Sequence, residues 1–237
     1  MSVFRLGKQN MRHKIFCVSM QRNGTSSVGD FLEQWALVRI GSPRSNKNRW
    51  PLKWLDGDFE SIFSDSDFVA ADVLEDDPWW FPEFYKVLYH RFPDARFILL
   101  DRDSDAWFRS LVRHSNGFSP GVTELHAKIY RREEEQRWLT ENIAGYGAQR
   151  HQELVIYDKA QHYISAYERH NREVKAFFAK HAPDSLFASP LNDSDLWPSL
   201  AAWLKLPALE TTDYRVHAHK AKGEFNQSHL LKTRQQP

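Results

Sequence analysis

The sequence contains a single cysteine, Cys17, among 237 residues. One cysteine excludes an intrachain disulfide and a metal site built from several cysteines. Because Cys17 stands inside the apolar run KIFCVSM, we expect it to be a small core residue and not a nucleophile. The reducing cytoplasm is therefore the expected location.

Long apolar runs are also missing. None approaches the roughly 18 residues that a membrane-spanning helix needs, and no apolar stretch typical of a signal peptide follows the charged N-terminal residues. Neither sign of charge dominates, since the chain contains 32 Lys and Arg residues and 31 Asp and Glu residues. Without an overall basic field we expect no nucleic-acid partner, so any anion site must be built locally. The histidines show no convincing metal-ligand spacing, and no metal is expected.

Apolar residues make up 41% of the chain and aromatic residues 14%, which is enough for a substantial core. The length favours one domain over residues 1–237, with a helical excursion at 115–155 and a basic tail at 213–237.

Strand and helix patterns alternate along the chain. Short β-branched and aromatic runs predict strands at 14–20, 67–73, 96–100 and 185–189. Helical spacing predicts helices at 28–35, 59–63, from Pro78 to 92, from Asp103 or Ser104 to 114, 122–142, 159–181 and 196–204, with a loop at 41–58. The alternation predicts a three-layer α/β domain in which helices flank a central, mostly parallel sheet.

The segment SMQRNGTSS, residues 19–27, lies between the first predicted strand and helix. Backbone N–H groups of such a turn and the positive end of the helix can cradle a phosphate. Gly24 permits close approach of the backbone, and Thr25 and Ser26 supply hydroxyl groups. A Walker A loop has Lys directly after its last Gly, whereas here the cation is Arg22. The alternative is an ordinary capped helix start after a surface turn.

The same segment resembles the 5′-phosphosulfate loop of sulfotransferases that use 3′-phosphoadenosine 5′-phosphosulfate (PAPS), which reads Pro-Lys/Arg-Ser/Thr-Gly-Thr-Thr. Arg22 takes the position of the basic residue. The resemblance implies a P-loop-type fold and a donor, PAPS, that leaves adenosine 3′,5′-bisphosphate as product. It implies that the donor is bound by Arg22, Asn23, Gly24, Thr25, Ser26 and Ser27.

Two positions depart from the family pattern. Gln21 replaces the usual Pro, and Ser27 stands where many members have a Trp that stacks on adenine. Adenine therefore needs another platform, which the sequence does not identify.

A second block, FPDARFILLDRDSDAWFRSLVRHS, resembles the family's 3′-phosphate motif: an Arg at a strand end and a Ser eight residues later. Arg102 and Ser110 have this spacing, and a guanidinium binds phosphate through two hydrogen bonds. The alternative is a surface pair of Arg102 with Asp103 or Asp105. Near the C-terminus, Lys222 and Gly223 are similar to part of the Arg-Lys-Gly segment that covers the 3′-phosphate.

Sulfuryl transfer also needs a base for the acceptor's proton. In the family this group follows the second strand, which selects Asp72, with Glu75 in reserve and His114 third. Asp77, directly before Pro78, is expected to cap the next helix.

The function expected from these motifs is sulfotransfer from PAPS to a hydroxyl or amine of a small-molecule or glycan acceptor, with Arg22 and Asp72 as the catalytic residues. Two alternatives stay open: a P-loop small-molecule kinase, and a nucleotide-binding homologue without catalysis. The acceptor and the oligomeric state have no motif in the sequence.

Overall fold

The computed structural model describes residues 13–146 and 154–209, so the predicted Lys222 and Gly223 and the basic tail lie outside the described residues. The described chain divides into two compact units. The first comprises residues 13–102 and 168–209, and the second comprises 103–146 and 154–167. The expected single domain over residues 1–237 stays a prediction.

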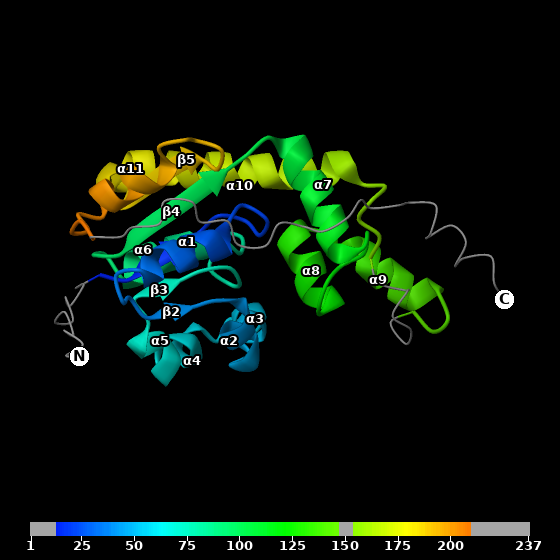
Figure 1. Ribbon diagram of the computed structural model, residues 1–237. Helices are drawn as coiled ribbons and strands as arrows, with labels where there is room; N and C mark the ends of the chain where they lie inside the picture. Colours follow the sequence, from blue (N-terminus) through cyan, green and yellow to red (C-terminus); the bar gives the residue numbers. More distant parts are fainter. Residues whose placement is uncertain (1–12, 147–153, 210–237) are drawn as a thin grey trace, which may run out of the picture. The chain divides into compact units, whose positions relative to one another are not determined.

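The first unit is built on a sheet of five parallel strands in the order β2-β3-β1-β4-β5 (Figure 1). Ile15 of β1 pairs with Val73 on one side and Arg96 on the other, so neighbouring strands start in register. The predicted parallel sheet is confirmed, and its strands end at one common edge. The strands are β1 (Ile15–Cys17), β2 (Arg39–Ile40), β3 (Val73–Leu74), β4 (Arg96–Asp101) and β5 (Leu186–Pro190).

Alternation along β1 divides the core into two layers. Ile15 and Cys17 pack with the apolar faces of α1 (Thr25–Glu33) and α11 (Leu196–Trp203). Phe16 points to the opposite face, where its ring lies 5.4 Å from Trp79 and 5.7 Å from Phe97. On that face the helices are α5 (Ser66–Ala70), through Phe68, α6 (Phe84–Arg91), through Phe84, and α10 (Ala160–His181), through Phe178. The three-layer α/β prediction is confirmed.

The segment predicted as a loop at 41–58 is largely helical. It contains α2 (Ser42–Lys47) and α3 (Trp50–Leu55), and the predicted α4 (Phe59–Phe63) follows. Pro lies in the first turn of both α2 and α3, where its fixed φ suits a helix start. The short strand β2 was not predicted, because two residues are too few for a pattern.

The predicted strand at 67–73 is wrong. Residues 66–70 form α5, whose first turn is capped by the Asp65 carboxylate accepting the N–H of Asp67. Lys14 Nζ donates to the carbonyls of Phe68 and Ala71 at the other end of this helix. A short apolar run fits a helix as well as a strand, and the caps decide for the helix.

The helix expected from Pro78 begins only at Phe84, after an N-cap at Glu83. Asp77 is therefore not a helix cap, and that prediction is wrong.

The second unit is helical, with α7 (Ser104–Ser115), α8 (Thr123–Tyr130), α9 (Glu133–Asn142) and the start of α10. The single helix predicted at 122–142 is interrupted at Arg131, whose φ of 55° is left-handed. A buried polar network stabilises this unit: the Tyr163 hydroxyl lies 2.8 Å from His126 Nε2 and accepts from Arg132 Nη1 at 2.7 Å. Burial lowers the pKa of His126 to about 3, so this histidine is neutral.

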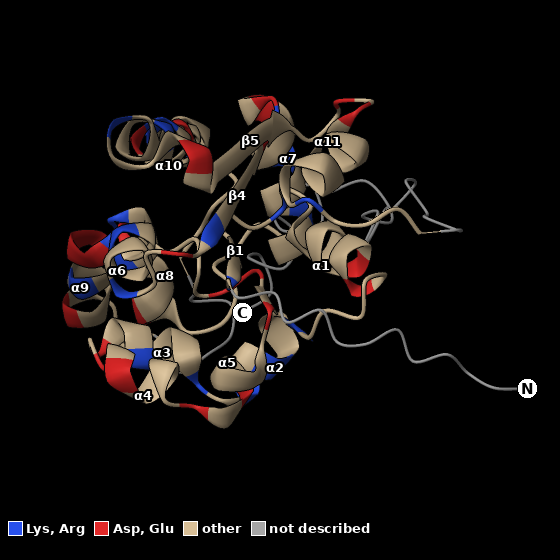
Figure 2. Ribbon diagram, turned by 90° about the vertical axis from the view of Figure 1, so that its left-hand side faces the viewer, with Lys and Arg blue, Asp and Glu red and all other residues tan. Residues whose placement is uncertain are grey.

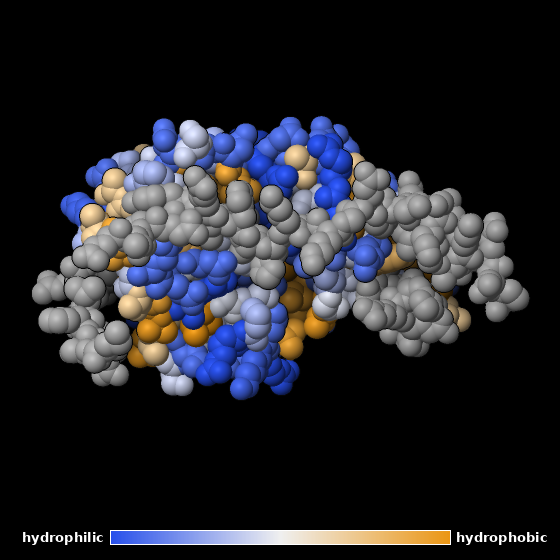
Figure 3. All heavy atoms as spheres, viewed as in Figure 1, coloured by the Kyte–Doolittle hydropathy of each residue, from blue (hydrophilic) through white to orange (hydrophobic). Residues whose placement is uncertain are grey.

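The surface carries both signs of charge, as on α9 in Figure 2, and the face drawn in Figure 3 is mostly hydrophilic with smaller apolar areas. Within the part of the chain that the structure describes, no helix combines the length and apolarity needed to cross a membrane.

Candidate active site

The loop between β1 and α1 is held at its start by two buried polar side chains. Ser19 Oγ accepts the N–H of Leu100 in β4 at 2.7 Å. His170 Nε2 donates to the carbonyl oxygen of Val18 at 2.8 Å. Because burial lowers the pKa of His170 to about 4, the ring is neutral and this hydrogen bond persists at neutral pH. These two hydrogen bonds therefore fix the position of residues 18 and 19, where the loop leaves the carboxyl edge of the sheet.

Within the loop, Arg22 and Gly24 both have positive φ, 70° and 74°. A Cβ on Gly24 would lie 2.6 Å from Leu191 Cδ1, so a side chain here would be both strained and crowded. Gly24 is the N-cap of α1 and provides no side-chain hydrogen bond to the first turn. The N-cap residue itself therefore occupies none of the backbone N–H groups of the first turn, which suits a bound anion.

Two arginines meet at this loop. Arg102, directly after β4, donates from Nη1 to the backbone oxygen of Arg22 at 3.4 Å. Burial lowers the pKa of Arg22, and the charge of Arg102 lowers it further. Two like charges held this close in a partly desolvated place favour an anion as their common partner.

The second member of the predicted 3′-phosphate motif, Ser110, lies on α7 in the second unit, and His114 lies in the last turn of the same helix. Asp103 is the N-cap of α7, where its Oδ1 accepts the N–H of Ala106 at 2.7 Å. The carboxylate of Asp103 thus has a structural role of its own. The roles of Arg102 and Ser110 toward a 3′-phosphate stay predictions.

The structure contradicts the placement of Asp72 at a strand end. Asp72 precedes β3, and its backbone oxygen accepts the N–H of Ile15, the first residue of β1. It lies at the amino edge of the sheet, opposite the edge from which the loop leaves. Its Oδ2 accepts the N–H of Val38 at 2.8 Å, which is a structural role. The placement that selected Asp72 as the base is therefore wrong, and the error follows from mistaking α5 for a strand.

Three carboxylates follow β3 at the carboxyl edge of the sheet, the edge from which the loop after β1 also leaves. They are Glu75, Asp76 and Asp77, which we call the acid turn. Asp76 has a φ of 68°, and the Asp77–Pro78 peptide is cis. Glu75 is 1% exposed, and its Oε1 accepts from Arg39. Burial raises the pKa of Glu75 to about 7, since desolvation outweighs Arg39.

Asp76 is the acid-turn residue whose charge is coupled to Arg22 in the loop between β1 and α1, residues 18–24, which we call the phosphate loop. Burial and the neighbouring Asp77 hold the pKa of Asp76 well above its usual value. Asp76 raises the pKa of Arg22, and Arg22 lowers that of Asp76, so the two opposite charges lie within range of each other. Part of the Asp76 surface remains exposed, unlike Glu75. A carboxylate with a raised pKa, coupled to the loop cation and only partly buried, can accept a proton near neutral pH.

Sequence reasoning held Glu75 in reserve as the base and expected Asp77 to cap a helix, but it did not select Asp76. The signal that could have selected it is the run of three acids just before Pro78, after the strand. Within the described residues, no group of three His, Cys, Asp or Glu side chains is placed to hold a metal ion.

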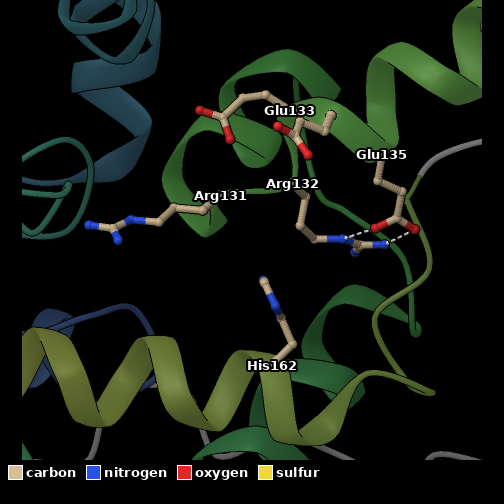
Figure 4. A pocket seen from close by; sticks show the side chains of 6 residues that line it. Arg131, Arg132, Glu133, Glu135 and His162 are labelled. Carbon is tan, nitrogen blue, oxygen red and sulfur yellow. Dashed lines mark hydrogen bonds and ion pairs between the residues drawn. The ribbon is translucent and has the colours of Figure 1, made fainter.

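A pocket of about 520 Å³ opens in the second unit (Figure 4). Much of its charge is already paired: Arg132 binds Glu135 through two hydrogen bonds of 2.7 and 2.8 Å. His162 Nε2 donates to the carbonyl of Tyr130. None of the predicted site residues lines it; its lining consists of Arg131, Arg132, Glu133, Glu134, Glu135 and His162.

Comparison with known proteins gives one family. A family profile described as "Sulfotransferase domain" matches residues 14–215. Among solved structures, the crystal structure of a sulfotransferase from Alicyclobacillus acidocaldarius is similar over 94% of this chain and 90% of that chain, with 16% identity and a TM-score of 0.45. No curated protein matches the sequence. The matched residues include the whole sheet, the phosphate loop and the acid turn.

Proposed function

Because the chain belongs to the sulfotransferase family, we propose that it transfers a sulfuryl group from PAPS to a hydroxyl or amine of an acceptor. The acceptor class we propose is a small molecule or a glycan. The observation that supports this most is that Arg22 is hydrogen-bonded through its backbone oxygen to Arg102 and is coupled electrostatically to Asp76. A pair of cations for the donor and a base for the acceptor is what sulfuryl transfer requires.

In this proposal the phosphate loop binds the 5′-phosphosulfate end of the donor. The N–H groups at the start of α1 and the hydroxyls of Thr25 and Ser26 provide hydrogen bonds, and Gly24 keeps the backbone accessible. Arg102 binds the 3′-phosphate together with Ser110. The residue after Gly24 is Thr25 and not Lys, which disfavours the kinase alternative.

The chemical step then needs two groups of this chain. The Asp76 carboxylate accepts the proton of the acceptor O–H or N–H as the acceptor forms its bond to sulfur. The bond between sulfur and the bridging oxygen breaks, and the electron pair stays on the 5′-phosphate. The products are the sulfated acceptor and adenosine 3′,5′-bisphosphate. Arg22 stabilises the negative charge that develops on this leaving group, a preorganised electrostatic effect.

Calorimetry tests the donor assignment without knowledge of the acceptor. Adenosine 3′,5′-bisphosphate should bind about tenfold to a hundredfold more tightly than AMP, because a charge-assisted hydrogen bond contributes about 1.5–3 kcal/mol. Replacing Arg102 by Ala should remove most of this difference and leave AMP binding nearly unchanged. Equal affinities of the native protein for the two nucleotides would overturn the donor assignment.

A further inference from the structure

Arg39, the first residue of β2, lies between the helix that follows the phosphate loop and the acid turn. Its Nε and Nη2 donate to Glu75 Oε1 at 3.0 and 2.8 Å. Its Nη1 donates to Asp30 of α1, and a longer contact of 3.4 Å reaches Glu33 one turn later. One guanidinium thus joins α1 to the turn that contains Asp76. Nothing in the donor or acceptor chemistry described above uses this residue.

Two glycines, Gly29 and Gly41, provide the space that the Arg39 and Glu75 side chains occupy. A Cβ on Gly29 of α1 would collide with the Arg39 guanidinium, and a Cβ on Gly41 would collide with Glu75 Oε1. Neither glycine has the positive φ that would explain its presence by backbone conformation. Small residues on both sides therefore mark a place where the charged pair needs close packing.

The Glu75 carboxylate is buried, the Arg39 guanidinium is partly buried, and the charge of Glu75 is compensated by Arg39. The Arg39 side chain is 18% exposed and that of Glu75 is 2% exposed. The second oxygen, Glu75 Oε2, has no hydrogen-bond partner among the described residues. A buried carboxylate that loses its cation is strongly unfavourable, because its charge is left uncompensated.

We propose that Arg39 is a positioning residue for the base: by neutralising and anchoring Glu75, it holds the acid turn so that Asp76 faces the phosphate loop. The inference rests on the proposed function. Glu75 directly precedes Asp76, and its own N–H is fixed to the carbonyl of Ile40 at 3.1 Å. Because both the backbone and the side chain of Glu75 are held, the next residue, Asp76, with its left-handed φ of 68°, leaves Glu75 in a fixed orientation. Without Arg39, Glu75 competes with Asp76 for protons and repels it when ionised.

The test is a double-mutant cycle on sulfuryl transfer from PAPS, with Arg39→Met, Glu75→Gln and the double variant. Phenols, primary alcohols, primary amines and water serve as acceptors. Arg39→Met should lower kcat about 10- to 100-fold while the KM for PAPS changes less than about threefold. Glu75→Gln removes the buried charge, so the double variant should recover most of the loss; a coupling this large is expected only for groups in direct contact.

Two further variants separate positioning from general stability. Gly29→Ala keeps every charge but displaces the guanidinium, so it should reproduce the loss of kcat. Asp30→Asn removes one charge on the α1 side of Arg39 and keeps the contact to Glu75, so kcat should stay within about twofold of the native value. Rates are measured well below the unfolding temperature of each variant, where a merely structural loss does not lower kcat.

The outcomes are distinct. If the native protein transfers sulfuryl groups and Arg39→Met keeps its kcat, the positioning role is overturned and the proposed function stands. The role is equally overturned if the two losses simply add in the double variant. If the native protein leaves PAPS intact with every acceptor, the proposed function fails, and this inference fails with it.

Discussion

In the proposed mechanism, proton transfer from the acceptor depends on Asp76. Asp76→Asn keeps the size of the side chain and removes its basicity, so turnover should fall about 10²- to 10⁴-fold while calorimetric binding of adenosine 3′,5′-bisphosphate persists. In the native protein kcat should rise with pH through an apparent pKa above that of an ordinary Asp, because burial and Asp77 favour the protonated form. Asp72→Asn is the control and should be nearly silent. A larger loss for Asp72→Asn than for Asp76→Asn would contradict the account.

Arg22 has a different signature, because its effect grows as charge moves onto the leaving group. Arg22→Ala should lower kcat more than it weakens donor binding, and Arg22→Lys should restore much of the rate. Steady-state kinetics with PAPS, combined with calorimetry, measures both quantities. An unchanged kcat in Arg22→Ala would exclude the catalytic role and leave the fold assignment intact.

At the scale of elements, the turn from β1 into α1 can be tested with two glycines of equal φ. Gly24 and Gly57 both have φ of 74°, but only the Cβ at Gly24 would meet a neighbour, Leu191. Both Ala variants should lose about 1 kcal/mol of stability through backbone strain. Only Gly24→Ala should also lose donor affinity, by about tenfold or more, because relief of the clash with Leu191 displaces the loop proposed to bind the donor.

Calorimetric titration with adenosine 3′,5′-bisphosphate and chemical denaturation give the two numbers for each variant. Equal effects of Gly24→Ala and Gly57→Ala on donor affinity would remove the loop from the binding site.

The sequence predicted the elements whose signals are local. The cap at Asp103 and the apolar run of β4 are continuous patterns, and the helix and strand appear where expected. The position of the loop that contains Arg22 and Gly24 was predictable for the same reason, since it lies directly between the first strand and the first helix. The position of Asp72 was not, because the tertiary contacts of Lys14 help to end α5 and shift the strand to Val73. The proximity of Asp76 to Arg22 depends on strand order, which no local pattern contains.

For the whole molecule, the buried acids and histidines set the dependence of stability on pH. The pKa values of Glu75 and Asp76 are raised to about 7 in the folded state. Between about pH 4 and pH 7 the folded state therefore keeps protons that the unfolded chain has already released. The free energy of unfolding consequently falls as the pH rises through this interval. His126 and His170 have lowered pKa values and act in the opposite direction, up to about pH 6.5. A net loss of stability is therefore expected above about pH 6.5.

Chemical denaturation between about pH 6.5 and 8 should show this loss, of about 1 kcal/mol, and Asp76→Asn should reduce it. Two outcomes would contradict this expectation: a free energy of unfolding that rises with pH in the native protein, or the same pH dependence in the native protein and in Asp76→Asn. Either would show that ionising the acid turn costs little free energy in the folded state. Asp72→Asn again serves as the control, since its carboxylate accepts a backbone N–H at an exposed position.

The central claim is that this chain moves a sulfuryl group from PAPS and does not move a phosphoryl group from ATP. Mass spectrometry of the protein incubated with each donor and a mixture of phenols, alcohols and amines tests it directly. The account predicts adenosine 3′,5′-bisphosphate and a sulfated acceptor in equal amounts, both greatly reduced in Arg22→Ala and Asp76→Asn, with ATP unchanged. Intact PAPS together with a phosphorylated acceptor and ADP would contradict it.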